Sequence, residues 1–138
     1  MNLIGKTIFA FLLVMTLMRC AWTDENESIK IIGNYYIGWS DLESNRTIHK
    51  KINSCTGCSN IIIDNYVFSV GNKDQYIFAK QQDGNNPLNT NYFLIDTLEN
   101  YNNSKGIYGP LNEKDFELLL KKLDLKKITF NKTFTRLN

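Results

Sequence analysis

The chain has few of the residues on which enzymes most often rely. Its 138 residues include one histidine and three cysteines. A nucleophilic triad requires a nucleophile, a base and a group that orients the base, and a single histidine leaves little choice of base. His49, Cys55 and Cys58 supply three ligands at most, whereas a structural zinc site needs about four. We therefore expect no catalytic residues, no metal site and no cofactor.

The chain also lacks an excess of either charge. It carries 16 basic and 14 acidic residues, and two of the basic ones, Lys6 and Arg19, lie in the first twenty positions. Without these two, the 14 remaining basic residues balance the 14 acidic ones. Proteins that bind nucleic acids carry a basic patch or stripe that neutralises phosphates, so nucleic acid is not an expected partner. The lysines at positions 121, 122, 126 and 127 indicate a solvated helix end favoured by the helix dipole, and contact with an anionic membrane is the alternative.

Long hydrophobic runs are absent except at the start of the chain. Residues 8–18 are apolar apart from Thr16, and Lys6 precedes them. As a helix, 11 residues rise only about 16 Å, roughly half the thickness of a hydrocarbon core. This length is typical of a signal peptide and too short for a membrane span. We therefore predict a signal peptide over residues 1–21, a polar tether over 22–28, and a protein exported to the periplasm, the outer envelope or the medium.

Cys20 leaves two ways of processing the leader open. A lipoprotein signal places a small residue directly before the lipid-bearing cysteine, but Arg19 occupies that position, although Leu17 suits the apolar position before it. Cleavage after Ala21 is the alternative, since a small residue precedes such a cut. Lipid attachment at Cys20 is therefore a candidate modification, and it is the only route to the membrane that we expect.

Residues 29–138 read as one domain rich in strands. Short β-branched and aromatic runs follow one another at close spacing, separated by Gly, Asn and Asp. Gly33-Asn34 suits a primed hairpin turn, and Gly71-Asn72-Lys73-Asp74 forms the expected loop of the strongest hairpin. We predict an α+β fold, an antiparallel β-meander sheet of about five to seven strands with one C-terminal helix packed on it. The strand signals cover residues 29–32, 35–39, 47–52, 61–63, 66–70, 75–80, 91–96 and 106–108, and residues 128–134 indicate a further edge strand.

The helix is the best-specified element. Asn112 is a suitable N-cap, Asp115 stands three residues later in the position of a capping-box partner, and Leu111 and Phe116 form a hydrophobic staple across the cap. An apolar stripe at helical spacing then predicts the face that packs against the sheet. The stripe consists of Phe116, Leu119, Leu120 and Leu123.

Cys55 and Cys58 are the most conspicuous pair of reactive side chains. In an oxidising compartment, two cysteines this close favour a local disulfide, which adds little stability because it closes a short loop. A thioredoxin-like redox motif is the alternative, but such a motif opens a helix, whereas the residues after Cys58 have a strand pattern. His49 lies on an alternating strand and faces the same way as Thr47 and Lys51, which indicates a surface histidine.

The order and spacing of three segments resemble a known family. The segments are a strand ending in Ala79-Lys80-Gln81, the strand Asn91–Asp96, and a Tyr108-Gly109-Pro110-Leu111 turn before the helix. The likeness covers Gly33 to Phe130. It is to an uncharacterised family of small exported bacterial proteins, many of them lipoproteins, whose domain has no known function. The resemblance implies an envelope location and an α+β domain, and it supplies no catalytic residues to transfer.

The function that these observations favour is a non-catalytic module of the cell envelope. Such a module would bind another protein or a surface component, and an immunity-type or inhibitor role suits its size. Outward-facing aromatic side chains among the strands would form the binding face. The alternatives are enzymes: a thiol redox protein that uses Cys55 and Cys58, or a hydrolase that brings two scattered carboxylates together in space.

Overall fold

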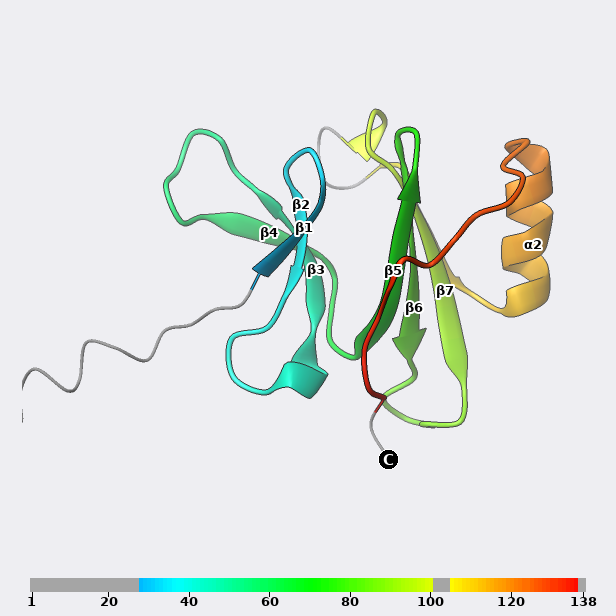
Figure 1. Ribbon diagram of the computed structural model, residues 1–138, viewed down its shortest axis with the longest axis horizontal. Coiled ribbons are helices and arrows are strands. Elements are labelled where there is room, and N and C mark those ends of the chain that lie inside the picture. The colour runs from blue at the N-terminus through cyan, green and yellow to red at the C-terminus, as the bar shows by residue number, and fades with distance from the viewer. Residues whose placement is uncertain (1–27, 101–104, 137–138) are drawn as a thin grey trace, which may run out of the picture.

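The computed structural model describes residues 28–100 and 105–136, which form three layers (Figure 1). A four-stranded sheet lies on one side, a five-stranded sheet in the middle and a single helix on the far side. All strand pairings are antiparallel. The expected α+β class, with a C-terminal helix on an antiparallel sheet, is therefore confirmed. The predicted leader, the tether up to residue 27 and Cys20 lie outside the described residues.

The strands are divided between two sheets, where the sequence suggested one meander. The first four strands follow one another in order as β1 (Ser28–Ile32), β2 (Tyr35–Gly38), β3 (Thr47–Lys51) and β4 (Ser59–Ile63), which we call the outer sheet. A 3-10 turn, η2 (Glu43–Asn45), stands between β2 and β3. The middle sheet has the order β8 (Ile107–Leu111), β7 (Thr90–Asp96), β6 (Tyr76–Gln82), β5 (Val67–Lys73) and β9 (Lys132–Thr133).

The chain passes from one sheet to the other at a sharp bend after β4. Asn65 and Tyr66 both have positive φ, 22° and 60°, a conformation that a bulky residue rarely adopts. The bend is held in place because the Gln81 side-chain amide donates to the Asn65 carbonyl at 3.1 Å and the Gln82 backbone N–H donates to the Tyr66 carbonyl at 3.0 Å. This bend directs β5 into a second sheet that packs on the first.

The centre of the middle sheet is buried on both faces, so β6 and β7 each contain an apolar run without alternation. In β6, Ile77 and Ala79 pack toward the outer sheet, while Phe78 between them packs toward the helix. In β7, Phe93 and Leu94 divide in the same way. The core between the sheets is completed from the outer sheet by Tyr35, Ile37, Ile48 and Ile63.

The helix α2 (Glu113–Lys122) begins at the expected cap. The Asp115 backbone N–H donates to the Asn112 side-chain oxygen at 2.9 Å, and the Asn112 amide donates back to the Asp115 carboxylate at 2.8 Å. Phe116 is buried, with its ring 5.1 Å from that of Tyr92 on β7. Leu119, Leu120 and Leu123 are partly buried in the same cluster. All four side chains of the stripe therefore lie against the middle sheet.

The segment after the helix crosses back over the middle sheet and closes one edge of the molecule (Figure 1). Phe130 packs edge-on against Phe78 at 5.4 Å between ring centroids, and Phe134 packs against the core between the sheets. Gly71 lies where this segment crosses β5. Gly71 is needed here because only a strand position without a side chain lets the crossing segment approach so closely. The expected four-residue hairpin loop starting at Gly71 is therefore wrong, since Gly71 belongs to β5, which continues to Lys73.

Arg46 ties the crossing segment to both sheets. Its side chain is buried, its Nε donates to the Val67 carbonyl at 2.9 Å, and one Nη donates to the Thr135 carbonyl at 2.5 Å. The guanidinium also lies 4.6 Å from the centre of the Phe134 ring. Glu43 pairs with it at 3.2 Å but is largely exposed. A buried cation thus satisfies two backbone acceptors at the point where the sheets and the C-terminal segment meet.

Candidate functional site

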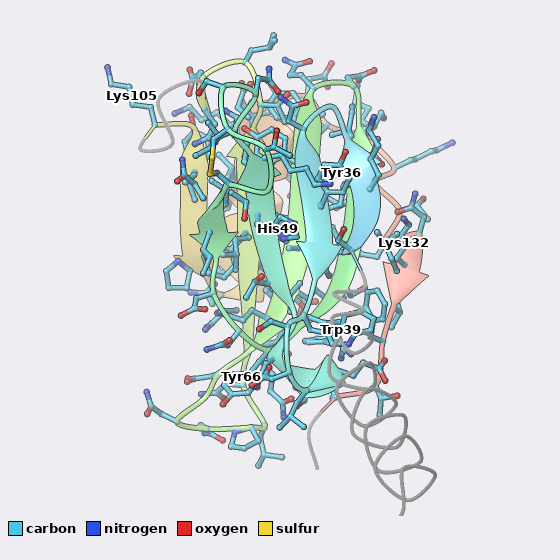
Figure 2. The ribbon with its side chains drawn as sticks, turned by 90° about the vertical axis from the view of Figure 1, so that its left-hand side faces the viewer. Tyr36, Trp39, His49, Tyr66, Lys105 and Lys132 are labelled. Atoms are coloured by element: carbon cyan, nitrogen blue, oxygen red, sulfur yellow. A yellow bond between two sulfur atoms is a disulfide. The ribbon has the colours of Figure 1, made fainter. Side chains whose placement is uncertain are left out.

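In the outer sheet, one broad face is not covered by any other element among the described residues (Figure 2). Side chains on a strand alternate between the two faces, and in β3 Ile48 is fully buried while Thr47 and His49 on either side of it point outward. Figure 2 looks onto this face, with His49 near its middle, Tyr36 on the neighbouring strand and Trp39 toward one end. His49 therefore lies on the surface of the sheet, as the alternation of β3 predicts.

A row of three side chains runs across the strands through His49. Tyr36 stands opposite His49 in the register of β2 and β3, and Ile61 stands opposite it on β4. The Tyr36 and His49 rings are stacked at 5.8 Å between centroids with an interplanar angle of 15°. The ammonium of Lys51 lies 4.0 Å from the centre of the Tyr36 ring, in the range of a cation–π contact. Ile61 is 61% exposed.

A β-bulge turns Ile61 outward. Strict alternation would place Ile61 and Ile63 on the same face, but the register shifts between the pairs Ile48–Ile63 and His49–Ile61. One extra residue, Ile62, lies between them, so Ile63 packs into the core and Ile61 faces solvent. Bulges of this kind often redirect a side chain beside a functional site.

The surroundings of His49 favour its neutral form. Burial among its neighbours lowers the pKa of the imidazole below its ordinary value, and the positive charge of Lys51 lowers it further. A neutral imidazole donates one hydrogen bond and accepts another. The ring therefore offers both functions, together with a flat surface, at the centre of the face.

The face is hollowed beside His49. The hollow has a volume of about 710 Å³, and its floor is formed by β3 and β4 with Thr47, His49 and Ile61. The loop after β2 bounds it at one side with Trp39, and the loop before β4 bounds it at the other with Cys58. Phe134 packs against the Trp39 ring at 6.5 Å with an interplanar angle of 74°, which fixes the position of the indole.

Two carboxylates also line the hollow, Asp41 and Asp64. The Asn45 amide donates to both oxygens of Asp41, at 3.1 and 3.2 Å. Hydrogen bonds from the Leu42 backbone and from Asn45 lower the pKa of Asp41, so that it stays ionised and can only accept hydrogen bonds. A glycosidase needs one carboxyl group held protonated, and the environment of Asp41 acts in the opposite direction.

Cys55 and Cys58 form a disulfide in the loop between β3 and β4 (Figure 2). The strand β4 begins at Ser59, directly after the pair. No helix therefore follows the cysteines, and the favourable field that a helix N-terminus gives a redox-active thiol is missing from this motif. Although His49, Cys58 and both acids line one hollow, the described residues contain no group of three His, Cys, Asp or Glu side chains that could hold a metal ion.

Sequence reasoning identified His49 and the aromatic strand residues, but it did not bring them together with the loop residues. Asp41 was one of several scattered carboxylates, and nothing in the pattern paired it with Asn45. Arg46 was not singled out at all, although it is among the largest buried side chains. A charged residue directly before an alternating strand was the available signal for it, since such a residue can point inward when backbone acceptors surround it.

The comparison with protein families supplies the identification. The model of a family described as "Protein of unknown function (DUF3997)" matches residues 32–134. The chain belongs to this family. The family domain thus covers nearly all the described residues, and the resemblance noted from the sequence is confirmed as far as membership of an uncharacterised family goes. No curated protein and no solved structure matches the chain.

Residues 28–100 and 105–136, which the structure describes, contain no helix long and apolar enough to cross a membrane. Their one α-helix, α2, has ten residues and carries charged side chains along its exposed side.

Proposed function

We propose that the protein is a non-catalytic binding module that is exported and meets its partner through the outer face of the four-stranded sheet. The observation that carries this proposal is the row Tyr36, His49 and Ile61 beside a hollow of about 710 Å³. Ligand sites typically have volumes of about 300–1,000 Å³ and combine apolar surface with a few polar groups. The other large sheet face, on the middle sheet, is covered by the helix and by the C-terminal segment.

The chemistry of the face supports binding more than catalysis. The thiols are joined to each other, the imidazole is stacked on a tyrosine, and Asp41 is held ionised by hydrogen bonds. An exported location is supported by the apolar run at residues 8–18 and by the disulfide, which suits an oxidising compartment.

The test is retention on the envelope of the native host. The protein, produced from its full coding sequence, is mixed with the washed envelope fraction and sedimented, and Ile61→Glu is compared with Leu118→Glu. The Ile61 and Leu118 side chains are both exposed, at 61% and 53%, but Leu118 lies on α2 in the opposite layer. We expect Ile61→Glu alone to abolish retention, with both variants melting like the native protein. Equal retention of the two variants, or no retention of the native protein, would overturn the proposal.

A further inference from the structure

We propose that the hollow on the outer face binds a neutral oligosaccharide of the cell envelope, an inference that rests on the proposed function and names the class of its ligand. The charges of the lining argue against an anionic ligand. Lys51 is opposed by Asp41 and Asp64, so the hollow has no positive excess that would attract a phosphate-rich polymer. Both acids lie in loops, Asp41 after β2 and Asp64 after β4.

The polar groups of the lining match a ligand that carries many hydroxyl groups. A hydroxyl both donates and accepts hydrogen bonds, so its partners can be donors, acceptors or both. Asp41 offers acceptors, Lys51 offers donors, and the Ser59 hydroxyl offers both, while the Thr47 hydroxyl donates to the Gly38 carbonyl at 3.4 Å and can still accept. These polar side chains come from β3, β4 and the loop after β2, which suits a ligand whose polar groups point outward along its edges.

The lining has few large apolar groups. Trp39 and Ile61 are the large apolar side chains, and His49 adds a second planar ring. A protein partner is normally gripped by a cluster of apolar anchors that is depleted of charge. Isolated flat surfaces surrounded by hydrogen-bonding groups instead suit the face of a sugar ring, where C–H groups lie on aromatic carbon and hydroxyls project from the rim.

The length of the hollow indicates more than one sugar ring. Along β3 the floor runs from Thr47 to Lys51, which at about 3.3 Å per residue is roughly 13 Å. Trp39 and Asp41 extend the lining beyond the end of this strand. A single ring would leave part of this floor uncovered, so the occupant is a short stretch of a glycan chain.

The experiment divides the envelope fraction into three samples: untreated, digested with protease, and oxidised with periodate, which cleaves the vicinal diols of sugars. We expect retention of the full chain on the untreated and protease-treated samples and its loss after periodate. An oligosaccharide fraction released from the same envelope and freed of protein should compete with retention. If retention is lost after protease but survives periodate, the ligand is not an oligosaccharide, and the proposed binding function stays intact. A loss after both treatments without competition by the oligosaccharides would also overturn the oligosaccharide as ligand, and no retention on the untreated sample would overturn both proposals.

Two variants test whether the ligand binds in the hollow. Trp39→Ala should weaken binding to the oligosaccharide fraction by about tenfold or more, the usual effect of removing an aromatic anchor. Because Trp39 also contacts Phe134, Ile61→Ser serves as a second variant whose side chain is exposed and whose removal leaves the core unchanged. Leu118→Ser on α2 is the matched control and should bind like the native protein. Unchanged binding by Ile61→Ser and by a folded Trp39→Ala would show that the ligand lies elsewhere and would overturn the assignment.

Discussion

The crossing of β5 by the C-terminal segment makes one strong prediction about stability. A Cβ added at Gly71 would lie 2.5 Å from Cε2 of Phe78 and 3.1 Å from Cα of Phe130, and still closer to the carbonyl oxygen of Thr129. Two of these atoms belong to the backbone, and the third to a fully buried ring. None can move aside without displacing the whole segment, so Gly71→Ala should disrupt the packing of this segment on the sheet.

The magnitude follows from two opposing effects. Overpacking a well-packed region destabilises a protein by about 1–3 kcal/mol. Replacing glycine by alanine also restricts the unfolded chain, which favours folding by about 0.4–1 kcal/mol. Gly84→Ala is the matched control, because its Cβ would meet only the edge of the Tyr66 ring at 3.3 Å in an exposed loop. The difference between the two variants therefore isolates the effect of the crossing.

The assay is urea unfolding of both variants, with limited proteolysis of the C-terminal segment as a second measurement. We expect Gly71→Ala to unfold with a free energy about 1–3 kcal/mol below that of Gly84→Ala, and to lose residues after position 126 to protease first. If the two variants agree within about 0.5 kcal/mol, a typical effect for a surface substitution, the segment does not pack across Gly71 and the reasoning fails.

Three further predictions concern the core, the tyrosine beside it and the disulfide. Phe116→Ala should lower the free energy of unfolding by about 3–5 kcal/mol, whereas Leu118→Ala should change it little, as measured by urea unfolding. Burial raises the pKa of Tyr35 to about 12, so the folded state keeps its proton where the unfolded chain loses it. The contribution of Tyr35 to stability should therefore be constant below pH 10 and fall between pH 10 and 12, and Tyr35→Phe should weaken this fall in thermal melts at graded pH. Reduction of Cys55–Cys58 should lower the free energy of unfolding by about 2 kcal/mol at most, because the closed loop is short; a loss of folding on reduction would contradict this.

The features that the sequence predicted well are those governed by neighbouring residues. The cap at Asn112 and the packing of Phe116 depend on contacts within a few positions of the chain, and both are found as expected. The hairpin between β5 and β6 was also expected, since β-branched and aromatic runs on either side of a polar turn specify it. These local rules identify the elements without showing which of them share a layer.

The features that the sequence did not predict depend on distant contacts. The division into two sheets follows from the bend at Asn65 and Tyr66, where an aromatic residue takes a conformation that its own preferences disfavour. The continuous burial of β6 and β7 follows from having a sheet on one side and a helix on the other. A run of apolar residues is compatible with either one covered face or two, so the number of layers could not be read from composition.

The bulge at Ile62 connects the architecture to the candidate site. In the outer sheet, the inward positions are filled by large apolar side chains that the core requires, such as Ile48 and Ile63. A strand with regular alternation would also bury Ile61, and the floor of the hollow would lose its exposed apolar group. The extra residue preserves the contribution of Ile63 to the core and places Ile61 opposite His49 on the other face. The proposed binding site therefore depends on this bulge, because without it the face beside the stacked histidine would lack Ile61.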